Sequence, residues 1–282
     1  MEKIPNLIYL GPAGSYTEIA AEKFMNTWGV KEFYRDIKNS IISVIEFMDN
    51  SNGNIGVVPV ENSIEGIVRE TIDNLVKTSS RVIITGETIV PISHCLISRS
   101  NTPESIEKII SIPQALAQCR SFLEKNFPQA EKLTAKSTSE AVRQLKEMPD
   151  SYAAVGSSKA AELYGLNILF SRINDEQDNL TRFVSLGSSI PSPTGNDKTS
   201  IAISTNNRPG ALVDILFIFK ENNINLSYIE SRPSKKVFGD YTFFIDFEGH
   251  MEDENIRRTI EKIIPYANFY RFLGSYPKAK AI

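Results

Sequence analysis

Short apolar runs alternate with amphipathic stretches over the first 187 residues of the chain. The runs at residues 7–10 and 55–60 predict strands, whereas residues 15–28 and 113–127 predict helices, because their apolar side chains recur at helical spacing. Strands and helices in alternation are typical of an α/β fold with a mostly parallel sheet.

Two long strand-like runs, residues 81–92 and 93–100, follow each other without a helix between them. This direct connection indicates a crossover between two lobes near residues 80–100, with a return near residues 170–187. A two-lobed α/β body usually binds its ligand between the lobes, at the loops that follow the carboxyl ends of strands. We therefore expect residues 1–187 to form one two-lobed body with its site between the lobes.

A segment rich in Ser, Pro and Gly, residues 188–198, has no periodicity and is predicted to be a linker. The remaining residues, 199–282, follow the order strand, helix, strand, strand, helix, strand. This βαββαβ order predicts a small ferredoxin-like domain. Domains of this type commonly pair through their sheet edges, so we expect the protein to self-associate.

Composition narrows the range of partners. The 282 residues carry a net charge of −3, which leaves no basic face for nucleic acid or an anionic membrane. The two histidines, His94 and His250, are isolated, and the two cysteines, Cys95 and Cys119, lack ligand spacing, so neither a metal nor another cofactor is expected. The apolar run near the N-terminus is too short for the core of a signal peptide, which predicts a cytoplasmic protein with reduced thiols.

Two polar segments follow predicted strands. In LGPAGS, Gly14 and Ser15 precede a helix whose N-terminus could bind an anion, although Ser15 could equally serve as a helix cap. Glu61, Asn62 and Ser63 end the strand at 55–60, where an amide and a hydroxyl can donate hydrogen bonds. The alternative for this second segment is an ordinary polar cap for the following helix.

A third segment, SIPQALAQC, combines the end of a strand with the start of a helix. Ser111 ends the strand, and Gln114 and Gln118 lie one helical turn apart on the same face. That face could line a site between the lobes, or it could lie in solvent.

The fourth segment, DNLTRF, lies at the end of a loop rich in Asn, Asp and Glu. Thr181 offers a hydroxyl, and Arg182 offers a guanidinium that can bind a carboxylate through two hydrogen bonds. Two alternatives exist. Asn179-Leu180-Thr181 also fits the acceptor pattern for glycosylation, and Arg182 could simply pair with one of three acidic neighbours: Asp175, Glu176 and Asp178.

Together these segments resemble the prephenate dehydratase family. GPAGSYTEIAA, PVENSIEGIVRETIDNL and SIPQALAQC are similar to three blocks of that family, and the tail resembles its ACT regulatory domain through RPGAL (208–212) and IESRP (229–233). The resemblance implies a two-lobed body of the type 2 periplasmic-binding-protein fold. No fused chorismate mutase domain is expected, since the chain starts at its first strand. The family signature is met at every position: Tyr164, Leu166, Leu169, Asp175, Thr181, Arg182, Phe183, Val184 and Leu186.

Two positions depart from the family pattern. Ile112 stands where the family usually has His, so no proton transfer is assigned to that position. Tyr228 stands where Lys or Arg normally precedes the Glu-Ser-Arg-Pro run, which leaves the details of effector binding open.

The resemblance implies conversion of prephenate to phenylpyruvate, with loss of water and carbon dioxide, in phenylalanine biosynthesis. Thr181 would donate a hydrogen bond to the departing ring hydroxyl, and Phe183 would form an apolar wall. Gly14, Ser15 and Glu61 would contact the substrate. The residues expected to orient its carboxylates and side chain are Asn62, Ser63, Ser111, Gln118 and Arg182.

The resemblance also implies phenylalanine as an allosteric effector, bound between paired ACT domains in a dimer or a tetramer of paired dimers. Its expected contacts are Gly210, Ala211, Leu212, Asn225, Leu226, Glu230, Ser231, Arg232 and Pro233. Two other functions stay open: an arogenate dehydratase, which acts on the amino analogue of prephenate, and a non-catalytic sensor of an amino acid or another solute.

Overall fold

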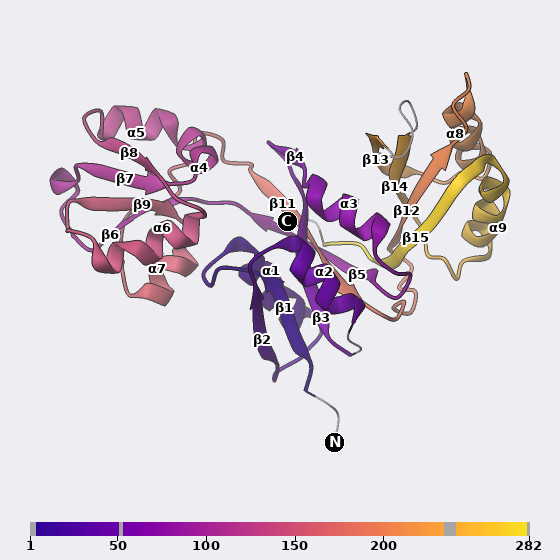
Figure 1. The fold of residues 1–282 in the computed structure, drawn as a ribbon, viewed down its shortest axis with the longest axis horizontal. Helices are drawn as coiled ribbons and strands as arrows, with labels where there is room; N and C mark the ends of the chain where they lie inside the picture. Colours follow the sequence, from indigo (N-terminus) through magenta and orange to yellow (C-terminus); the bar gives the residue numbers. More distant parts are fainter. Residues whose placement is uncertain (1–3, 51–52, 234–240, 281–282) are drawn as a thin grey trace.

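The computed structural model describes residues 4–50, 53–233 and 241–280. The outer ends of the predicted domains, residues 1–3 and 281–282, lie outside this part of the chain. Three sheets form three bodies, and the first body lies between the other two (Figure 1). In the described part of the chain, no helix is long and apolar enough to cross a membrane.

The central body, lobe 1, contains a six-stranded sheet with the order β2-β1-β3-β11-β5, in which β4 pairs with β3. Its strand β11 comes from much later in the chain than the other five. The strands are β1 (Asn6–Leu10), β2 (Tyr34–Lys38), β3 (Ile55–Asn62), β4 (Gly66–Ile67), β5 (Ile83–Pro91) and β11 (Leu180–Gly187), and the helices are α1 (Tyr16–Thr27), α2 (Ile41–Asp49) and α3 (Arg69–Lys77).

The second body, lobe 2, contains a five-stranded sheet with the order β10-β6-β9-β7-β8. The predicted helix at 113–127 is interrupted at Cys119, which ends one helix and precedes the next. The strands are β6 (Cys95–Ser98), β7 (Lys108–Ser111), β8 (Glu131–Thr134), β9 (Tyr152–Gly156) and β10 (Asn167–Phe170), and the helices are α4 (Pro113–Gln118), α5 (Arg120–Asn126), α6 (Thr138–Gln144) and α7 (Ser158–Tyr164), with 3₁₀ turns at Pro103–Ser105 and Leu145–Glu147.

The third body, the C-terminal domain, has the predicted βαββαβ order, and this prediction is confirmed. Its four-stranded sheet has the order β13-β14-β12-β15. The first strand begins inside the predicted linker 188–198, at Asp197. The elements are β12 (Asp197–Thr205), α8 (Ala211–Glu221), β13 (Leu226–Pro233), β14 (Tyr241–Glu248), α9 (Glu254–Ile263), a 3₁₀ turn (Ile264–Tyr266) and β15 (Ala267–Pro277).

The α/β class is confirmed, but the sheets of both lobes are mixed instead of mostly parallel. In lobe 1, β1 runs parallel to β2 and β3, whereas β11 runs antiparallel to β3 and β5. In lobe 2, β7 runs parallel to β8 and β9, whereas β6 runs antiparallel to β9 and β10. Strand β11 enters lobe 1 directly from lobe 2, and β6 enters lobe 2 directly from lobe 1. Parallel neighbours need a crossover connection, usually a helix, and neither strand follows one, so both run antiparallel to their neighbours.

The two connections between the lobes are bonded to each other. We call residues 92–94 the outbound segment and residues 171–179 the return segment. Backbone N–H groups of Ile92 and Ile173 donate to the carbonyls of Asn179 and His94, at 2.8 and 3.0 Å. The buried side chain of Asn174 accepts from the N–H of His94 at 2.6 Å and donates to the carbonyl of Ile92 at 3.1 Å. The lobes are therefore joined by a cross-linked pair of segments.

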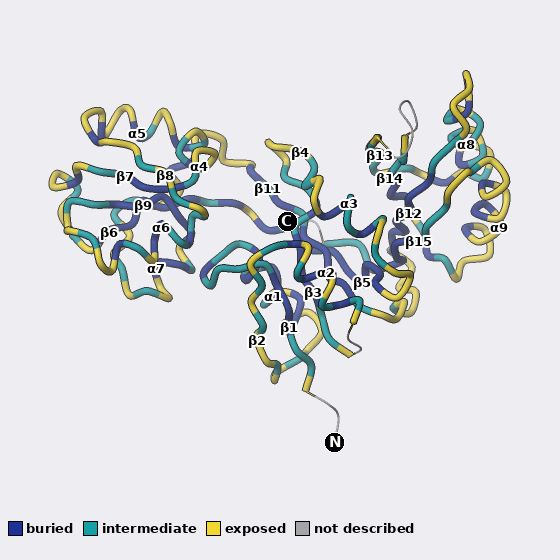
Figure 2. Tube along the Cα trace, in the orientation of Figure 1, coloured by how far each residue is buried: buried dark blue, intermediate teal, exposed yellow. Residues whose placement is uncertain are grey.

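The C-terminal domain and lobe 1 share one hydrophobic core. Val184 and Leu186 of β11 belong to the same buried cluster as four residues of the C-terminal domain: Ala202, Phe244, Leu273 and Tyr276. Buried residues lie on both sides of this junction (Figure 2). One face of β11 is thus covered by the C-terminal domain.

Candidate active site

Thr181 lies inside strand β11, paired with β3 and β5, and not at the end of a loop. Its closest partners in the register are Asn62 on β3 and Val90 on β5. Successive residues of a strand point to opposite faces. Thr181 and Phe183 therefore share one face of the sheet, and Arg182 lies on the other.

The Asn62 amide donates to Thr181. Its Nδ2 lies 2.8 Å from Thr181 Oγ1, and its Oδ1 accepts from the backbone N–H groups of Ile64 and Glu65, each at 3.0 Å. Because those two donors fix the oxygen side of the amide, the nitrogen side must face Thr181. The hydroxyl of Thr181 acts as acceptor in this bond, so its own hydrogen is available to another group.

Asn179 and Gln118 extend these contacts into lobe 2. Asn62 Nδ2 also donates to Asn179 Oδ1 at 2.6 Å, and Asn179 Nδ2 donates to Gln118 Oε1 at 3.2 Å. Gln118 Nε2 lies 3.5 Å from a carboxylate oxygen of Glu65 in lobe 1. We call Asn62, Asn179 and Gln118 the amide chain; it connects Thr181 to the helix α4 of the other lobe.

Sequence reasoning treated Asn179 only as a possible glycosylation acceptor. The structure excludes that interpretation, because Asn179 has no exposed surface and its side chain is bonded on both sides. A signal for its role was present in the sequence: Asn179 stands two residues before Thr181, which places both on one face of an extended chain.

Asp175, a position of the family signature, fixes the helix that carries Gln118. Its N–H donates to the carbonyl of Gln118 at 2.7 Å, and its carboxylate accepts from the N–H of Ser121 at 3.0 and 3.2 Å. Asp175 thereby ties the return segment to the break between α4 and α5.

The two predicted serines are both engaged in bonds within the fold. Ser63 Oγ accepts from the N–H of Leu180 at 2.9 Å, which holds the start of β11 against the end of β3. Ser111 is buried and donates to the carbonyl of Val155 at 2.7 Å. Ile112, at the position where the family usually has His, packs against the lobe 2 core. Ser63 therefore lies beside the strand that carries Thr181, whereas the hydroxyl hydrogen of Ser111 is used in its bond to Val155.

The predicted anion-binding position at Gly14 and Ser15 is already filled by a carboxylate of the protein itself. The N–H of Gly14 donates to the Glu18 carboxylate at 2.6 Å, and Ser15 caps α1 by accepting from the N–H of Glu18 at 3.3 Å. The turn also packs on lobe 2, since a Cβ at Gly14, where φ is +79°, would come within 2.9 Å of Ala160. The structure supports the capping alternative for Ser15.

Phe183 does not form an open wall beside Thr181. It is 2% exposed and lies in a core of lobe 1 together with Leu7, Tyr9, Phe24 and Val57. Its large ring is used to pack β11 on α1.

Arg182 faces the C-terminal domain. Its NH1 lies 2.6 Å from Asp246 Oδ2 on β14 and 3.2 Å from Glu87 Oε2 on β5, and its Nε lies 3.4 Å from Glu61 Oε2. The prediction of a hydroxyl and a guanidinium acting side by side is therefore wrong, because neighbours in a strand point to opposite faces. The alternative partners Asp175, Glu176 and Asp178 are not the residues that pair with Arg182 either. For the same reason Glu61, expected at the substrate, lies with Arg182 on the side away from Thr181.

Tyr228, one of the two departures from the family pattern, packs on this cation. The Arg182 guanidinium lies 5.5 Å from the centre of the Tyr228 ring. Burial lowers the pKa of Arg182, but the carboxylates of Asp246 and Glu87 outweigh burial and raise it above its ordinary value. Arg182 therefore stays charged inside the junction.

Glu87 joins the same cluster from lobe 1. Lys198 Nζ lies 3.0 and 2.9 Å from its two oxygens, and the N–H of Ala279 donates to it at 3.0 Å. Burial raises the pKa of Glu87, but Lys198 and Arg182 more than offset burial and hold it below the ordinary value of 4.5.

This depressed pKa predicts an acid-sensitive junction. The ionised form of Glu87 contributes stability that is complete above about pH 5 and is lost as the pH falls through the folded-state pKa. We expect the difference in melting temperature between the parent and Glu87→Gln to be largest near neutral pH and to shrink below about pH 4.5. The exposed Glu147→Gln serves as control and should show no such trend; a Glu87→Gln difference that is constant with pH would contradict the argument.

The cysteines offer no nucleophile to the site. Cys95 and Cys119 are both free and buried. Burial, together with the neighbouring Asp175 and Cys95, raises the pKa of Cys119 to about 12. Within the described residues, no group of His, Cys, Asp and Glu could hold a metal ion.

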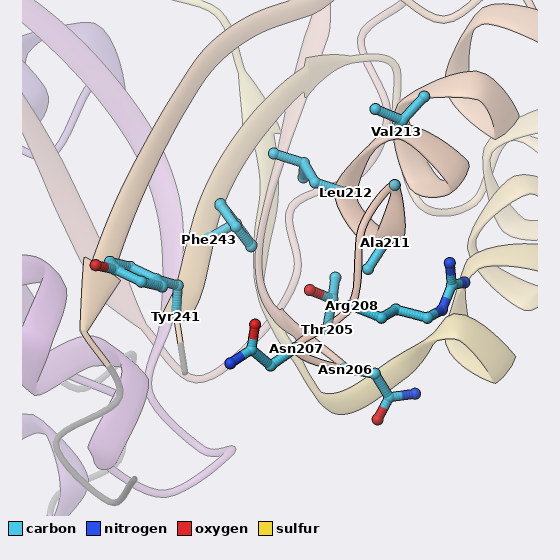
Figure 3. Close-up of a pocket in the computed structure, with 10 residues that line it drawn as sticks. Thr205, Asn206, Asn207, Arg208, Ala211, Leu212, Val213, Tyr241 and Phe243 are labelled. Atoms are coloured by element: carbon cyan, nitrogen blue, oxygen red, sulfur yellow. The ribbon is translucent and has the colours of Figure 1, made fainter. Parts of the chain in front are cut away.

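A cavity of about 220 Å³ lies at the start of α8 in the C-terminal domain. Of the predicted effector contacts, Gly210, Ala211 and Leu212 line it. Leu212 points from the first turn of α8 toward Phe243 of β14, and Tyr241 is the first residue of that strand (Figure 3). Gly210 has φ of +80°, which favours glycine at this turn.

Strand β13 places the other predicted effector contacts on two faces. Ser231 and Pro233 are opposite Phe243 and Tyr241 in the register, so they lie beside the cavity. Arg232 points away from it and pairs with Asp73 of α3 at 3.2 Å. Glu230 lies on the Arg232 face by the alternation of the strand. These two residues therefore contact or face lobe 1 and not the cavity.

Asn225 and Leu226 lie at the other end of β13. Asn225 lines a separate, larger hollow with Glu248 and Asp253, and Leu226 packs against the core of the C-terminal domain. Within one chain, the structure does not bring Asn225 and Leu226 to Gly210–Leu212.

Fold and site together define a class of protein: a two-lobed α/β body with polar groups of both lobes meeting at a shared strand, joined to a βαββαβ domain that has its own cavity. A family model for prephenate dehydratase matches residues 7–190, and one for the ACT domain matches residues 199–265.

Individual relatives agree with these matches. A bifunctional chorismate mutase/prephenate dehydratase of Aquifex aeolicus is 42% identical over 99% of this chain and 75% of its own length. A prephenate dehydratase of Methanocaldococcus jannaschii is 41% identical over 96% of this chain and 97% of its own. The crystal structure of a prephenate dehydratase from Arthrobacter aurescens in complex with L-Phe superposes with a TM-score of 0.87 at 32% identity, covering 96% of this chain and 90% of that one. The chain belongs to the prephenate dehydratase family, a family of lyases, and carries an ACT domain.

Proposed function

We propose that this protein converts prephenate to phenylpyruvate and that Thr181 assists the loss of the ring hydroxyl. The observation that carries the proposal is the Asn62–Thr181 hydrogen bond, which uses Thr181 as acceptor and leaves its hydrogen for a bound ligand. Membership of the family supports the choice of substrate.

The reaction needs no strong nucleophile. The bond between the ring and its carboxylate breaks, and its electron pair enters the ring as carbon dioxide leaves. The carbon–oxygen bond on the opposite side of the ring breaks at the same stage, and hydroxide departs and takes up a proton from solvent to become water. A hydrogen bond from Thr181 stabilises the charge that develops on the departing oxygen.

Asn62 and Gln118 complete the proposed site. Asn62 orients the Thr181 hydroxyl, and Gln118 approaches from lobe 2 through the amide chain. Ser63 fixes the start of β11.

Turnover of prephenate by the purified protein tests the proposal, with the absorbance of phenylpyruvate as readout. Arogenate serves as comparison substrate under the same conditions. A protein that leaves prephenate unchanged, or that turns over arogenate far faster, would refute the assignment.

We further propose that L-phenylalanine binds the cavity at the start of α8 and inhibits the enzyme. The apolar groups of Leu212, Phe243 and Tyr241 suit an aromatic side chain, and the relative crystallised with L-Phe supports the choice of ligand. Inhibition requires that phenylalanine bind the less active arrangement more tightly.

Leu212→Ala is expected to weaken phenylalanine binding roughly tenfold, since it removes much of an apolar contact with the ring. Titration of the melting temperature and of the prephenate rate with L-phenylalanine measures the effect. Ile42→Ala, an exposed apolar change on α2 of lobe 1, should leave both titrations as in the parent. Equal titration curves for Leu212→Ala and the parent would exclude this cavity.

We propose self-association through the ACT domains, as a dimer or a tetramer of paired dimers. Strand β13 is an edge of its sheet and exposes Ile229, and Tyr241 is exposed on the neighbouring strand β14. Helix α8 of the same domain exposes Val213 and Phe217. Sedimentation velocity measures the assembly, and a monomer at micromolar concentration would refute it. A cytoplasmic location is proposed as well, supported by the two free thiols.

A further inference from the structure

His94 occupies the outbound segment between the lobes and is 3% exposed. Its backbone is fixed on both sides: the N–H donates to Asn174, and the carbonyl accepts from Ile173. Its ring contacts both lobes, with Nδ1 3.3 Å from the Tyr16 hydroxyl of lobe 1 and Nε2 3.2 Å from Gln118 Oε1 of lobe 2. The ring thus stands at the lobe 2 end of the amide chain.

The orientation of each amide in the chain follows from its neighbours. Asn62 is fixed by two backbone donors, so its nitrogen faces Asn179 as well as Thr181. Asn179 must therefore present its oxygen to Asn62 and its nitrogen to Gln118. Gln118 must then present its oxygen to Asn179, which also turns its nitrogen toward the Glu65 carboxylate.

This order fixes the histidine. The Gln118 oxygen that faces Asn179 also faces His94 Nε2, and an amide oxygen only accepts. His94 must therefore carry its hydrogen on Nε2. Nδ1 is then the acceptor, and the Tyr16 hydroxyl is shared between it and the carbonyl of Ser93 at 2.7 Å.

From this geometry we infer that His94 is a positioning residue for Thr181, acting through the amide chain; the inference rests on the function proposed above. By donating to Gln118, His94 keeps the Gln118 oxygen turned toward Asn179, and Asn179 in turn keeps its oxygen as an acceptor for an Asn62 N–H; the amide chain therefore supports the Asn62 orientation that the two backbone donors set. If Gln118 were reversed, its nitrogen would face the nitrogen of Asn179. Turning Asn179 in response would bring its nitrogen against that of Asn62, the residue that orients Thr181.

The ring is suited to this role because it stays neutral. Burial lowers the pKa of His94, and the hydrogen bond to Gln118 offsets only part of that effect. A neutral ring with its hydrogen on Nε2 has one donor and one acceptor, which gives the chain a defined direction.

Two substitutions of His94 separate positioning from packing. Glutamine is long enough to place an N–H near the position of Nε2, whereas asparagine is not. We expect His94→Asn to lower kcat for prephenate roughly tenfold, the factor that corresponds to one ordinary buried hydrogen bond, with KM within about twofold. His94→Gln should keep kcat within about threefold of the parent. Equal losses in the two variants, or no loss in His94→Asn, would overturn the inference.

A matched control is available because the chain has only one other histidine. His250 is buried in the C-terminal domain, between β14 and α9, and its Nε2 lies 3.0 Å from the carbonyl of Pro191. His250→Asn should leave kcat unchanged, and melting curves of all variants show whether the fold is kept.

Nitrogen-15 NMR of histidine-labelled protein gives a readout without substrate. The signal lost in His94→Asn identifies His94, and we expect it to show a neutral ring with hydrogen on Nε2. Hydrogen on Nδ1 would overturn the inference even in a fully active enzyme. Because this result does not depend on turnover, a parent protein that leaves prephenate unchanged would refute the proposed function alone.

Discussion

Replacing Thr181 by Val is expected to lower kcat for prephenate by roughly 10²–10³-fold, the usual loss for one preorganised donor to a developing charge. Valine keeps the volume of the side chain and removes the hydroxyl. KM should change by less than about threefold, because a bond that forms mainly in the transition state contributes little to substrate binding. Steady-state kinetics well below the melting temperature measures both constants.

Thr181→Ser is the matched control, since it retains the hydroxyl and should keep most of the activity. The Val variant removes one acceptor of the Asn62 amide but leaves the carbonyl of Leu180 at 3.2 Å, so the expected loss of stability is that of one ordinary hydrogen bond, about 0.5–1.5 kcal/mol. Melting curves separate that loss from the loss of rate. A Val variant with kcat within a few-fold of the parent would remove Thr181 from the mechanism.

Replacing Arg182 by Leu is expected to lower the free energy of unfolding by about 3–5 kcal/mol, because it leaves buried carboxylates without their cation. The Arg182 side chain is 10% exposed, and that of Asp246 is fully buried. Glu87 keeps Lys198 as a partner, so most of the cost falls on Asp246. Urea denaturation measures the change.

Arg143→Leu is the control for losing an arginine at the surface. Its partner is Glu140, three residues earlier on the same helix, and the Arg143 side chain is 54% exposed, so the expected change is below about 1 kcal/mol. Adding Asp246→Asn to Arg182→Leu should recover part of the loss, because the unpaired charge is removed. Strictly additive losses in the double variant would show that the two residues do not interact.

The order of elements could be predicted wherever apolar residues recur regularly. In α9, Ile256, Ile260 and Ile263 are buried at helical spacing, and the sequence alone indicates this helix. Strands β2 and β8 were not predicted, since both are short, polar edges of their sheets, and an edge in solvent needs no apolar alternation. Helix α7 was missed as well, because seven residues are too few to show a period.

The sequence predicted which residues belong to the site better than it predicted where their side chains point. Asn62, Gln118 and Thr181 were named from motifs, and the structure brings them into one set of hydrogen bonds. The direction of Arg182 depends on Thr181 and Arg182 both lying inside a strand, whereas the sequence suggested a loop. Its partner Asp246 lies 64 residues further along in another domain, a distance over which no local pattern carries information.

Strand β11 has a consequence for how the protein is made. All five strands of lobe 2 come from one continuous stretch, β6 to β10, so that lobe can close as soon as this stretch has left the ribosome. The sheet of lobe 1 cannot, since β5 is attached to β3 only through β11, which is synthesised after the whole of lobe 2. The body that begins the chain is thus completed second, and the strand that completes it is the one that carries Thr181.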